Sequence, residues 1–273
     1  MSIFISLRFV SARLRVVSAT VIAMIDITYP PIIMSAYGMF KALGLKFMIE
    51  GADNMPRKGG VVLASNHVSY LDFIFCGYST RSSNRLVRFM AKESVFDNRI
   101  SGPLMRSMHH IPVDRAAGAK SLDNAVDWLR QGEVVGVFPE ATISQSFELK
   151  DFKTGAVRMA VEAEVPIVPM ITFGGQRLWT KGRKRDLERN ATLALTLGEP
   201  FTVSKSKSAE EATADLKAQM QVLYDDTIER YPAPPAGTWW WPARFGGGAP
   251  TLAEISARDA AERAKREGHG EGS

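Results

Sequence analysis

The feature that most constrains the fold is an alternation of short apolar runs with segments of helical period, between residues 44 and 231. Strands that alternate with helices are typical of a sheet covered by helices. We therefore predict an α/β fold with a mixed, mostly parallel sheet flanked by helices. The apolar runs predict strands over Lys46–Glu50, Gly60–Ser65, Val87–Ala91, Ile111–Val113, Val134–Phe138, Ile167–Phe173 and Ala191–Leu197. The helical periods predict helices over Leu71–Ser79, Gly102–Met108, Lys120–Gln131, Thr154–Glu164 and Ser208–Arg230.

Composition limits the class of protein. The chain has 273 residues, 45% hydrophobic and 23% charged, which is ordinary for a globular protein with one large domain. A single cysteine, Cys76, excludes an intramolecular disulfide and agrees with a reducing compartment. The net charge of +5 suits an anionic partner. The sequence has no zinc-ligand cluster, helix-turn-helix signature or RNA-binding aromatic motif, so we expect no nucleic acid partner.

Residues 1–43 predict a separate membrane-associated segment. The stretch Val16–Phe40 carries one charge, Asp26, and is interrupted again by Pro30-Pro31. An aspartate at the bilayer centre costs about 3 kcal/mol, which disfavours a spanning helix. We expect two amphipathic or half-inserted helices in the cytoplasmic leaflet, with the basic residues of the segment on that side. A cleaved signal peptide and an ordinary pair of core helices are the alternatives.

A titratable pair follows the predicted strand Gly60–Ser65. His67 stands five residues before Asp72, at the carboxyl end of that strand, where active sites of α/β proteins collect. A neutral imidazole can take a proton from an alcohol near pH 7, and a carboxylate on its other nitrogen fixes the tautomer. If a helix opens at Leu71-Asp72, the chain can bend Asp72 back toward His67. A structural hydrogen bond between the two is the alternative.

Four ordered blocks resemble the motifs of the glycerophospholipid acyltransferases, the 1-acyl-sn-glycerol-3-phosphate acyltransferase family. The His-x4-Asp pair resembles the first motif and Ile111–Arg115 the second. Phe138–Ser144 resembles the third motif, usually Phe-Pro-Glu-Gly-Thr-Arg-Ser, and Val165–Pro169 the fourth. The resemblance covers roughly residues 40 to 230. It places the acyltransferase domain at residues 44–231, between the membrane segment 1–43 and a C-terminal segment 232–273.

The resemblance implies roles for several side chains. His67 is the expected general base, and Asp72 orients it and balances its charge, as in hydrolase triads. Arg115 aligns with the arginine that the family uses for the acceptor phosphate, and its planar fork suits phosphate oxygens. Glu140 is expected near the acceptor, where it binds the glycerol or organises the arginine. Surface or structural roles for Arg115 and Glu140 are the alternatives.

The third motif departs from the family pattern at two positions. Ala141 replaces glycine, and we expect an ordinary backbone conformation there that accommodates alanine. Ile143 replaces an arginine, so a phosphate-binding charge is missing. We predict that a nearby lysine supplies it, and take Thr142, Lys150 and Lys153 as further substrate-binding residues.

The C-terminal segment 232–273 begins with a proline-rich linker, followed by Trp239-Trp240-Trp241. Tryptophan favours the lipid headgroup zone, so the three rings indicate either membrane contact or a clasp folded back onto the domain. Residues 251–266 predict a charged helix, and residues 267–273 a disordered tail. The basic run Lys181–Arg185 either contacts the phosphates of CoA or lipid, or forms a solvated loop.

These features predict a membrane-associated O-acyltransferase at the cytoplasmic face of the cell membrane. It would move a fatty acyl group from acyl-CoA or acyl carrier protein to lysophosphatidic acid, giving phosphatidic acid. The family transfers the acyl group directly, so we expect no cofactor and no metal. Glycerol 3-phosphate or another lysophospholipid is the alternative acceptor. A thioesterase and an inactive lipid-binding protein are further alternatives, although no Gly-x-Ser-x-Gly elbow is present.

Overall fold

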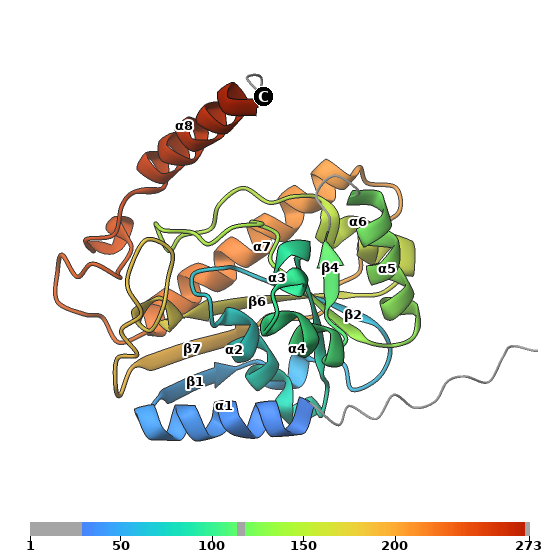
Figure 1. Ribbon diagram of the computed structural model, residues 1–273, viewed down its shortest axis with the longest axis horizontal. Helices are drawn as coiled ribbons and strands as arrows, with labels where there is room; N and C mark the ends of the chain where they lie inside the picture. Colours follow the sequence, from blue (N-terminus) through green and yellow to red (C-terminus); the bar gives the residue numbers. More distant parts are fainter. Residues whose placement is uncertain (1–28, 114–117, 271–273) are drawn as a thin grey trace, which may run out of the picture.

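A seven-stranded sheet forms the centre of the molecule (Figure 1). The computed structural model describes residues 29–113 and 118–270. The strands are β1 (Lys46–Glu50), β2 (Val61–Ser65), β3 (Val87–Lys92), β4 (Ile111–Val113), β5 (Val134–Val137), β6 (Ile167–Phe173) and β7 (Thr192–Leu197). The helices are α1 (Tyr29–Leu43), α2 (Asp72–Ser79), α3 (Glu93–Asp97), α4 (Ser101–Ser107), α5 (Gly118–Arg130), α6 (Gly155–Ala163), α7 (Ala209–Arg230) and α8 (Leu252–Gly270).

The sheet is mixed and mostly parallel, as predicted. Its strand order is β1-β7-β6-β2-β5-β3-β4, and β6 with β7 is its antiparallel pair. The central strand β2 pairs in parallel with both β5 and β6. The carboxyl ends of these three strands therefore meet at one edge of the sheet, which is where the predicted site residues follow them.

Helices cover both faces of the sheet. All five residues of β2 are buried, as expected for a parallel strand that is covered on both sides. Val62 and Ala64 face a core shared with α5, α6 and α7, whereas Val61 and Leu63 face a core shared with α1 and α2. The alternation of side chains along the strand thus divides the interior into two apolar layers.

Local sequence explains where several helices begin and end. Ser208 caps α7 by accepting a hydrogen bond from the Glu211 backbone N–H, and the Glu211 side chain accepts one from the Ser208 backbone. This reciprocal pair is a capping box. Gly132 follows α5 with φ of 89°, a left-handed conformation that favours glycine and ends a helix.

The described part of the N-terminal segment packs against the sheet. Tyr29 and Phe40 of α1 are 9% and 4% exposed, and the Tyr29 hydroxyl donates a hydrogen bond to the Val87 carbonyl. Pro30 and Pro31 fall in the first turn of α1, where proline is tolerated because those N–H groups have no helical partner. Residues 1–28, the rest of the predicted membrane segment, lie outside the described residues. Within residues 29–113 and 118–270, no helix combines the length and apolar character needed to cross a bilayer.

The tryptophan triplet folds back onto the domain. Trp240 and Trp241 are 8% and 5% exposed, and both rings contact Phe173 of β6 and Tyr231, which follows α7. The clasp alternative is therefore confirmed for these two rings, and membrane contact by them is wrong. Burial of the apolar rings against the aromatic residues of the core lowers the free energy more than their placement in a partly hydrated membrane interface.

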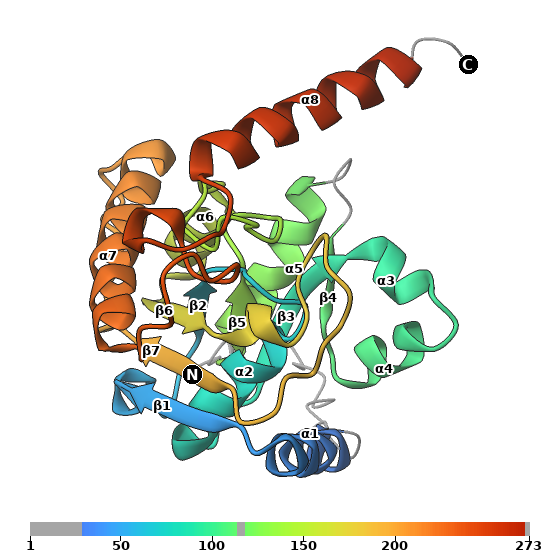
Figure 2. The same cartoon turned by 90° about the vertical axis from the view of Figure 1, so that its left-hand side faces the viewer.

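The last helix, α8, projects from the rest of the molecule (Figures 1 and 2). It runs from Leu252 to Gly270, so the predicted disordered tail is wrong for residues 267–270. The helix continues because Ala, Glu, Lys and Arg, which favour helices, extend to Glu267. Residues 271–273 lie outside the described part of the chain.

Candidate active site

His67 and Asp72 form the predicted pair. His67 follows β2, Asp72 is the first residue of α2, and Nδ1 of His67 lies 2.9 Å from Oδ2 of Asp72. The His67 side chain is 20% exposed and that of Asp72 is fully buried. The Phe138 ring stacks on the imidazole, with centroids 4.2 Å apart. With Nδ1 bonded to the carboxylate, Nε2 is the nitrogen that can take a proton from a substrate.

Hydrogen bonds hold the Asp72 carboxylate in place from three directions. Its Oδ2 accepts from the backbone N–H groups of Val68 and Ser69, each at 2.7 Å, in addition to His67. Its Oδ1 accepts from the Thr172 hydroxyl at 3.1 Å. Burying a polar group costs free energy unless it is hydrogen-bonded, and these four hydrogen bonds meet that condition for Asp72.

The neighbouring strand β6 helps to position this pair. The Asn66 side-chain amide donates to the Thr172 carbonyl at 3.0 Å and accepts from the Thr172 N–H at 2.7 Å. Thr172 therefore binds both Asn66 and Asp72. Asn66 and Thr172 were not predicted as site residues; the available signal was Thr172, a lone polar residue near the end of the otherwise apolar predicted strand Ile167–Phe173.

Glu140 lies beside His67 and is buried. Its Oε1 accepts from the His67 backbone N–H at 3.1 Å and its Oε2 from the Lys150 backbone N–H at 3.3 Å. Burial raises the pKa of the Glu140 carboxyl to about 8, against the smaller opposite effects of these bonds and of the Lys150 charge. Glu140 thus joins the His67 loop to the segment around Lys150, and it is mostly uncharged at neutral pH.

The turn at the third motif is strained where the family has glycine. Ala141 has φ of 58°, so the expected ordinary backbone is wrong. The Ala141 N–H closes a turn onto the Phe138 carbonyl at 2.9 Å, and this turn directs Glu140 inward. Left-handed backbone costs an L-residue roughly 1 kcal/mol. Ile143 is 6% exposed, so an apolar buried side chain stands where the family motif has a cation.

The structure brings Lys150 and Thr142 together but not Lys153. The Lys150 ammonium donates to the Thr142 hydroxyl at 2.9 Å and forms an ion pair with Asp259 of α8. Lys153 is exposed, and its backbone N–H bonds to the Pro139 carbonyl. Arg115 lies outside the described residues. Asp259 was missed because nothing in the local sequence links it to Lys150.

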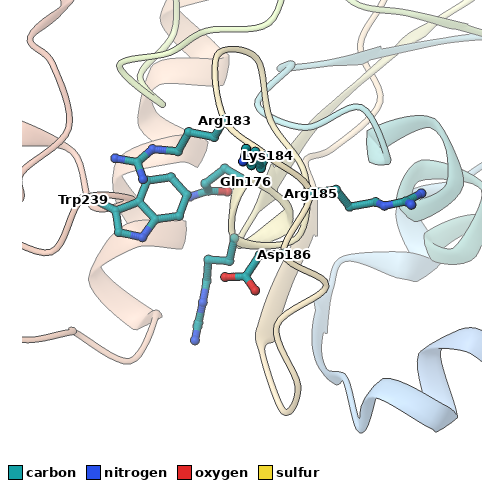
Figure 3. Close-up of a pocket in the computed structure, with 7 residues that line it drawn as sticks. Gln176, Arg183, Lys184, Arg185, Asp186 and Trp239 are labelled. Atoms are coloured by element: carbon teal, nitrogen blue, oxygen red, sulfur yellow. The ribbon is translucent and has the colours of Figure 1, made fainter.

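The basic run lies on a loop anchored beside the His67 segment. The Thr180 hydroxyl donates to the Val68 carbonyl, and the Tyr70 N–H donates to the Trp179 carbonyl. A pocket of about 310 Å³ opens next to this loop (Figure 3). There the Arg183 guanidinium lies 3.8 Å from the centre of the Trp239 ring, while Arg185 points to the other side of the loop. The residues that line this pocket are Gln176, Arg177, Arg183, Lys184, Arg185, Asp186 and Trp239.

The chain is similar to known acyltransferases. The family model described as "Acyltransferase" matches residues 46–172. A Bacillus subtilis protein named 1-acyl-sn-glycerol-3-phosphate acyltransferase is 32% identical over 157 residues, which are 56% of this chain and 72% of that protein. The chain belongs to the glycerophospholipid acyltransferase family. As a member of that family it is an O-acyltransferase.

Two further proteins extend the comparison of this acyltransferase. A Limnanthes douglasii protein named 1-acyl-sn-glycerol-3-phosphate acyltransferase is 32% identical over 146 residues, 52% of this chain and 50% of that protein. The chain thus spans about half the length of this plant relative. The crystal structure of the 1-acyl-sn-glycerophosphate (LPA) acyltransferase PlsC from Thermotoga maritima superposes with a TM-score of 0.62 at 23% identity, over 74% of this chain and 80% of that one. The acyltransferase shares that fold.

Proposed function

We propose that this acyltransferase moves a fatty acyl group from acyl-CoA, or from acyl carrier protein, to the free hydroxyl of 1-acyl-sn-glycerol-3-phosphate. The product is phosphatidic acid. The observation that carries the proposal is the His67–Asp72 pair at the carboxyl end of β2, with Nδ1 and Oδ2 2.9 Å apart. The names of the Bacillus and Limnanthes relatives support the acceptor.

The reaction needs a base because an alcohol is a weak nucleophile near pH 7. The acceptor oxygen forms a bond to the thioester carbonyl carbon while its proton passes to Nε2 of His67. The tetrahedral intermediate then collapses, the carbon–sulfur bond breaks, and the His67 proton goes to the leaving thiolate. Asp72 stabilises the imidazolium between these steps, and no covalent acyl-enzyme forms.

Cationic and polar groups near the base support a phosphorylated acceptor. Lys150 and Thr142 lie within hydrogen-bond distance of each other, and Glu140 joins Lys150 to the His67 loop. In the proposal, Lys150 and Arg115 bind the acceptor phosphate, and Lys153 contributes charge at the rim. The basic pocket beside Arg183 is the proposed site for phosphates of the acyl donor.

The first experiment follows thiol release from palmitoyl-CoA by the purified enzyme, with and without lysophosphatidic acid. We expect release to depend on the acceptor and to disappear in His67→Ala, with an unchanged thermal unfolding midpoint. Activity of the variant within about tenfold of wild type would contradict the assignment of the base. Release without acceptor identifies a thioesterase, and activity on glycerol 3-phosphate alone identifies the other acceptor.

We also propose that the enzyme works at the cytoplasmic leaflet of the cell membrane. Exposed apolar side chains on and between α3 and α4 support this, since Val95, Ile100 and Leu104 are 36%, 87% and 41% exposed. Residues 1–28 are apolar and basic, as in interfacial anchors. Deleting them should abolish flotation with vesicles that contain anionic lipid. The deletion stops before Tyr29 because α1 packs in the core. Undiminished flotation would exclude residues 1–28 as the anchor.

A further inference from the structure

A carboxylate from the end of the chain lies between two lysines near the catalytic base. Asp259 of α8 pairs with the ammonium of Lys150, and its Oδ1 lies 4.0 Å from Nζ of Lys181. The same Lys150 ammonium donates to the Thr142 hydroxyl at 2.9 Å. Two cations and a hydroxyl thus surround one anionic group.

The anion site is close to the reacting histidine. Lys150 binds Oε2 of Glu140 through its backbone N–H, and Oε1 of Glu140 accepts from the His67 backbone. Lys181 belongs to the loop whose preceding residue, Thr180, bonds to the Val68 carbonyl next to His67. Lys181 therefore follows a residue that contacts the His67 loop directly, and Lys150 is joined to that loop through Glu140.

Asp259 reaches this site from the first half of α8, where Ile255 is also buried. Ile255 is 1% exposed and lies one helical turn before Asp259, so both side chains leave the same face of α8. The Asp259 side chain is 15% exposed and that of Lys150 is 13% exposed, although α8 itself projects from the body (Figure 2). An apolar contact and an ion pair hold the first half of the helix over the loops below it.

We propose that Lys181 and Thr142 join Lys150 in the binding site for the acceptor's phosphate monoester, and that Asp259 occupies this site until the acceptor displaces it. The inference rests on the proposed function, whose acceptor carries such a phosphate. A phosphate monoester brings close to two negative charges and three acceptor oxygens, whereas the carboxylate brings one charge. The phosphate and the Asp259 carboxylate repel each other and compete for the same ammonium groups, so acceptor binding weakens the docking of α8.

A purely structural ion pair is the alternative. Such a pair would hold α8 in place to the same extent whether or not a phosphate ligand is present. Only displacement of Asp259 by the acceptor makes the docking of α8 depend on bound phosphate. The tests therefore measure both the docking of α8 and the affinity for phosphate.

The first test measures binding without catalysis, using the full chain and sn-glycerol 3-phosphate as the probe. Calorimetry should show affinity about fivefold higher in Asp259→Asn than in wild type, because removing one competing ion pair is worth about that factor. Asp226→Asn, which removes an exposed charge of α7, is the control and should match wild type. Equal or weaker binding by Asp259→Asn overturns the inference.

The second test follows the helix. Hydrogen exchange of residues 252–261 should accelerate when the probe is added to wild type, and should be unaffected by it in Lys150→Ala. Lys205→Ala, which removes an exposed lysine that pairs with Glu164, is the matched control and should respond like wild type. Exchange that the probe leaves unchanged in wild type overturns the displacement of α8.

Turnover separates this inference from the proposed function. We expect Asp259→Asn to lower the KM for lysophosphatidic acid and Lys150→Ala to raise it at least tenfold. Acyl transfer to lysophosphatidic acid with the same KM in both variants overturns the phosphate site and leaves the proposed function standing. Absence of transfer by wild type overturns the proposed function, and the probe-binding tests still decide the inference.

Discussion

Replacing Asp72 with asparagine isolates the charge of the catalytic pair. Oδ2 of Asp72 accepts from Nδ1 of His67 and from the Val68 and Ser69 backbones, and Oδ1 accepts from the Thr172 hydroxyl. An amide oxygen at the Oδ2 position can keep the first three bonds. The amide NH₂ then faces the Thr172 hydroxyl, which can accept from it. The substitution therefore removes one negative charge with little change of shape.

The expected loss follows from Coulomb's law. When His67 takes the proton from the acceptor, the imidazolium and the Asp72 carboxylate have charge centres about 4 Å apart. At an effective dielectric constant of about 20 their attraction is about 4 kcal/mol. Each 1.36 kcal/mol is a factor of ten in rate, so we expect kcat/KM to fall roughly 1,000-fold. Because the Asp72 side chain is fully buried, the KM for the acceptor should change by no more than about threefold.

The assay is acceptor-dependent thiol release, with the thermal unfolding midpoint as a check of folding. Thr172→Val is the matched control, because it removes a hydrogen bond to Asp72 and leaves the charge. We expect this control to stay within about tenfold of wild type. If Asp72→Asn retains its midpoint and also remains within tenfold of wild type, the carboxylate does not stabilise a protonated His67. Equal losses of activity in Asp72→Asn and Thr172→Val would show that Asp72 acts by holding His67 in position and not through its charge.

Two further predictions concern the third motif. The pKa of Glu140 is raised to about 8, so above about pH 4.5 the folded state keeps a proton that the unfolded state releases. The free energy of unfolding should therefore fall as the pH rises from about 4.5 to about 8, by up to about 1.4 kcal/mol per pH unit. Glu140→Gln should lose this component of the slope in urea titrations at pH 5.5 and 7.5, and an unchanged slope would contradict the pKa shift. Ala141→Gly should relieve the left-handed backbone but add entropy to the unfolded chain, for a net change in the free energy of unfolding between zero and a gain of about 1 kcal/mol. Ala141→Val should instead destabilise by about 1 kcal/mol or more in the same titration, and a larger loss in the glycine variant than in the valine variant would refute the strain.

Short-range features of the sequence were sufficient for the seven strands, for most of the helices and for the His67–Asp72 pair, but the short helix α3 (Glu93–Asp97) was not predicted. The apolar run Val61–Ser65 follows Gly59-Gly60 and becomes the strand β2. The pairing of His67 with Asp72 followed from a strand end and a helix start only five residues apart. Such a separation leaves the chain few ways to keep the two side chains apart.

Other features depend on contacts between distant segments. The order of the strands and the reversed direction of β7 are set by packing of both sheet faces, which no single run of residues encodes. The bond between Thr172 and Asp72 joins residues 100 positions apart. The ion pair between Lys150 and Asp259 spans 109 positions.

The conformation of Ala141 was mispredicted for a different reason. The residue type favours ordinary backbone, but the turn that closes onto Phe138 and buries Glu140 requires positive φ at this position. The contact of Glu140 with the His67 loop outweighs a local preference of roughly 1 kcal/mol.

The antiparallel direction of β7 allows part of the loop before it to be replaced without a change in the sheet. Since β6 and β7 run in opposite directions, the connection between Phe173 and Thr192 leaves and re-enters the sheet at the edge that carries His67. A connection that begins and ends at one edge can change in length or charge without altering any strand pairing. Grafting only residues 181–187 of this loop from a relative would therefore exchange the rim of the site, while Trp179 and Thr180 keep their bonds to the segment that carries the base.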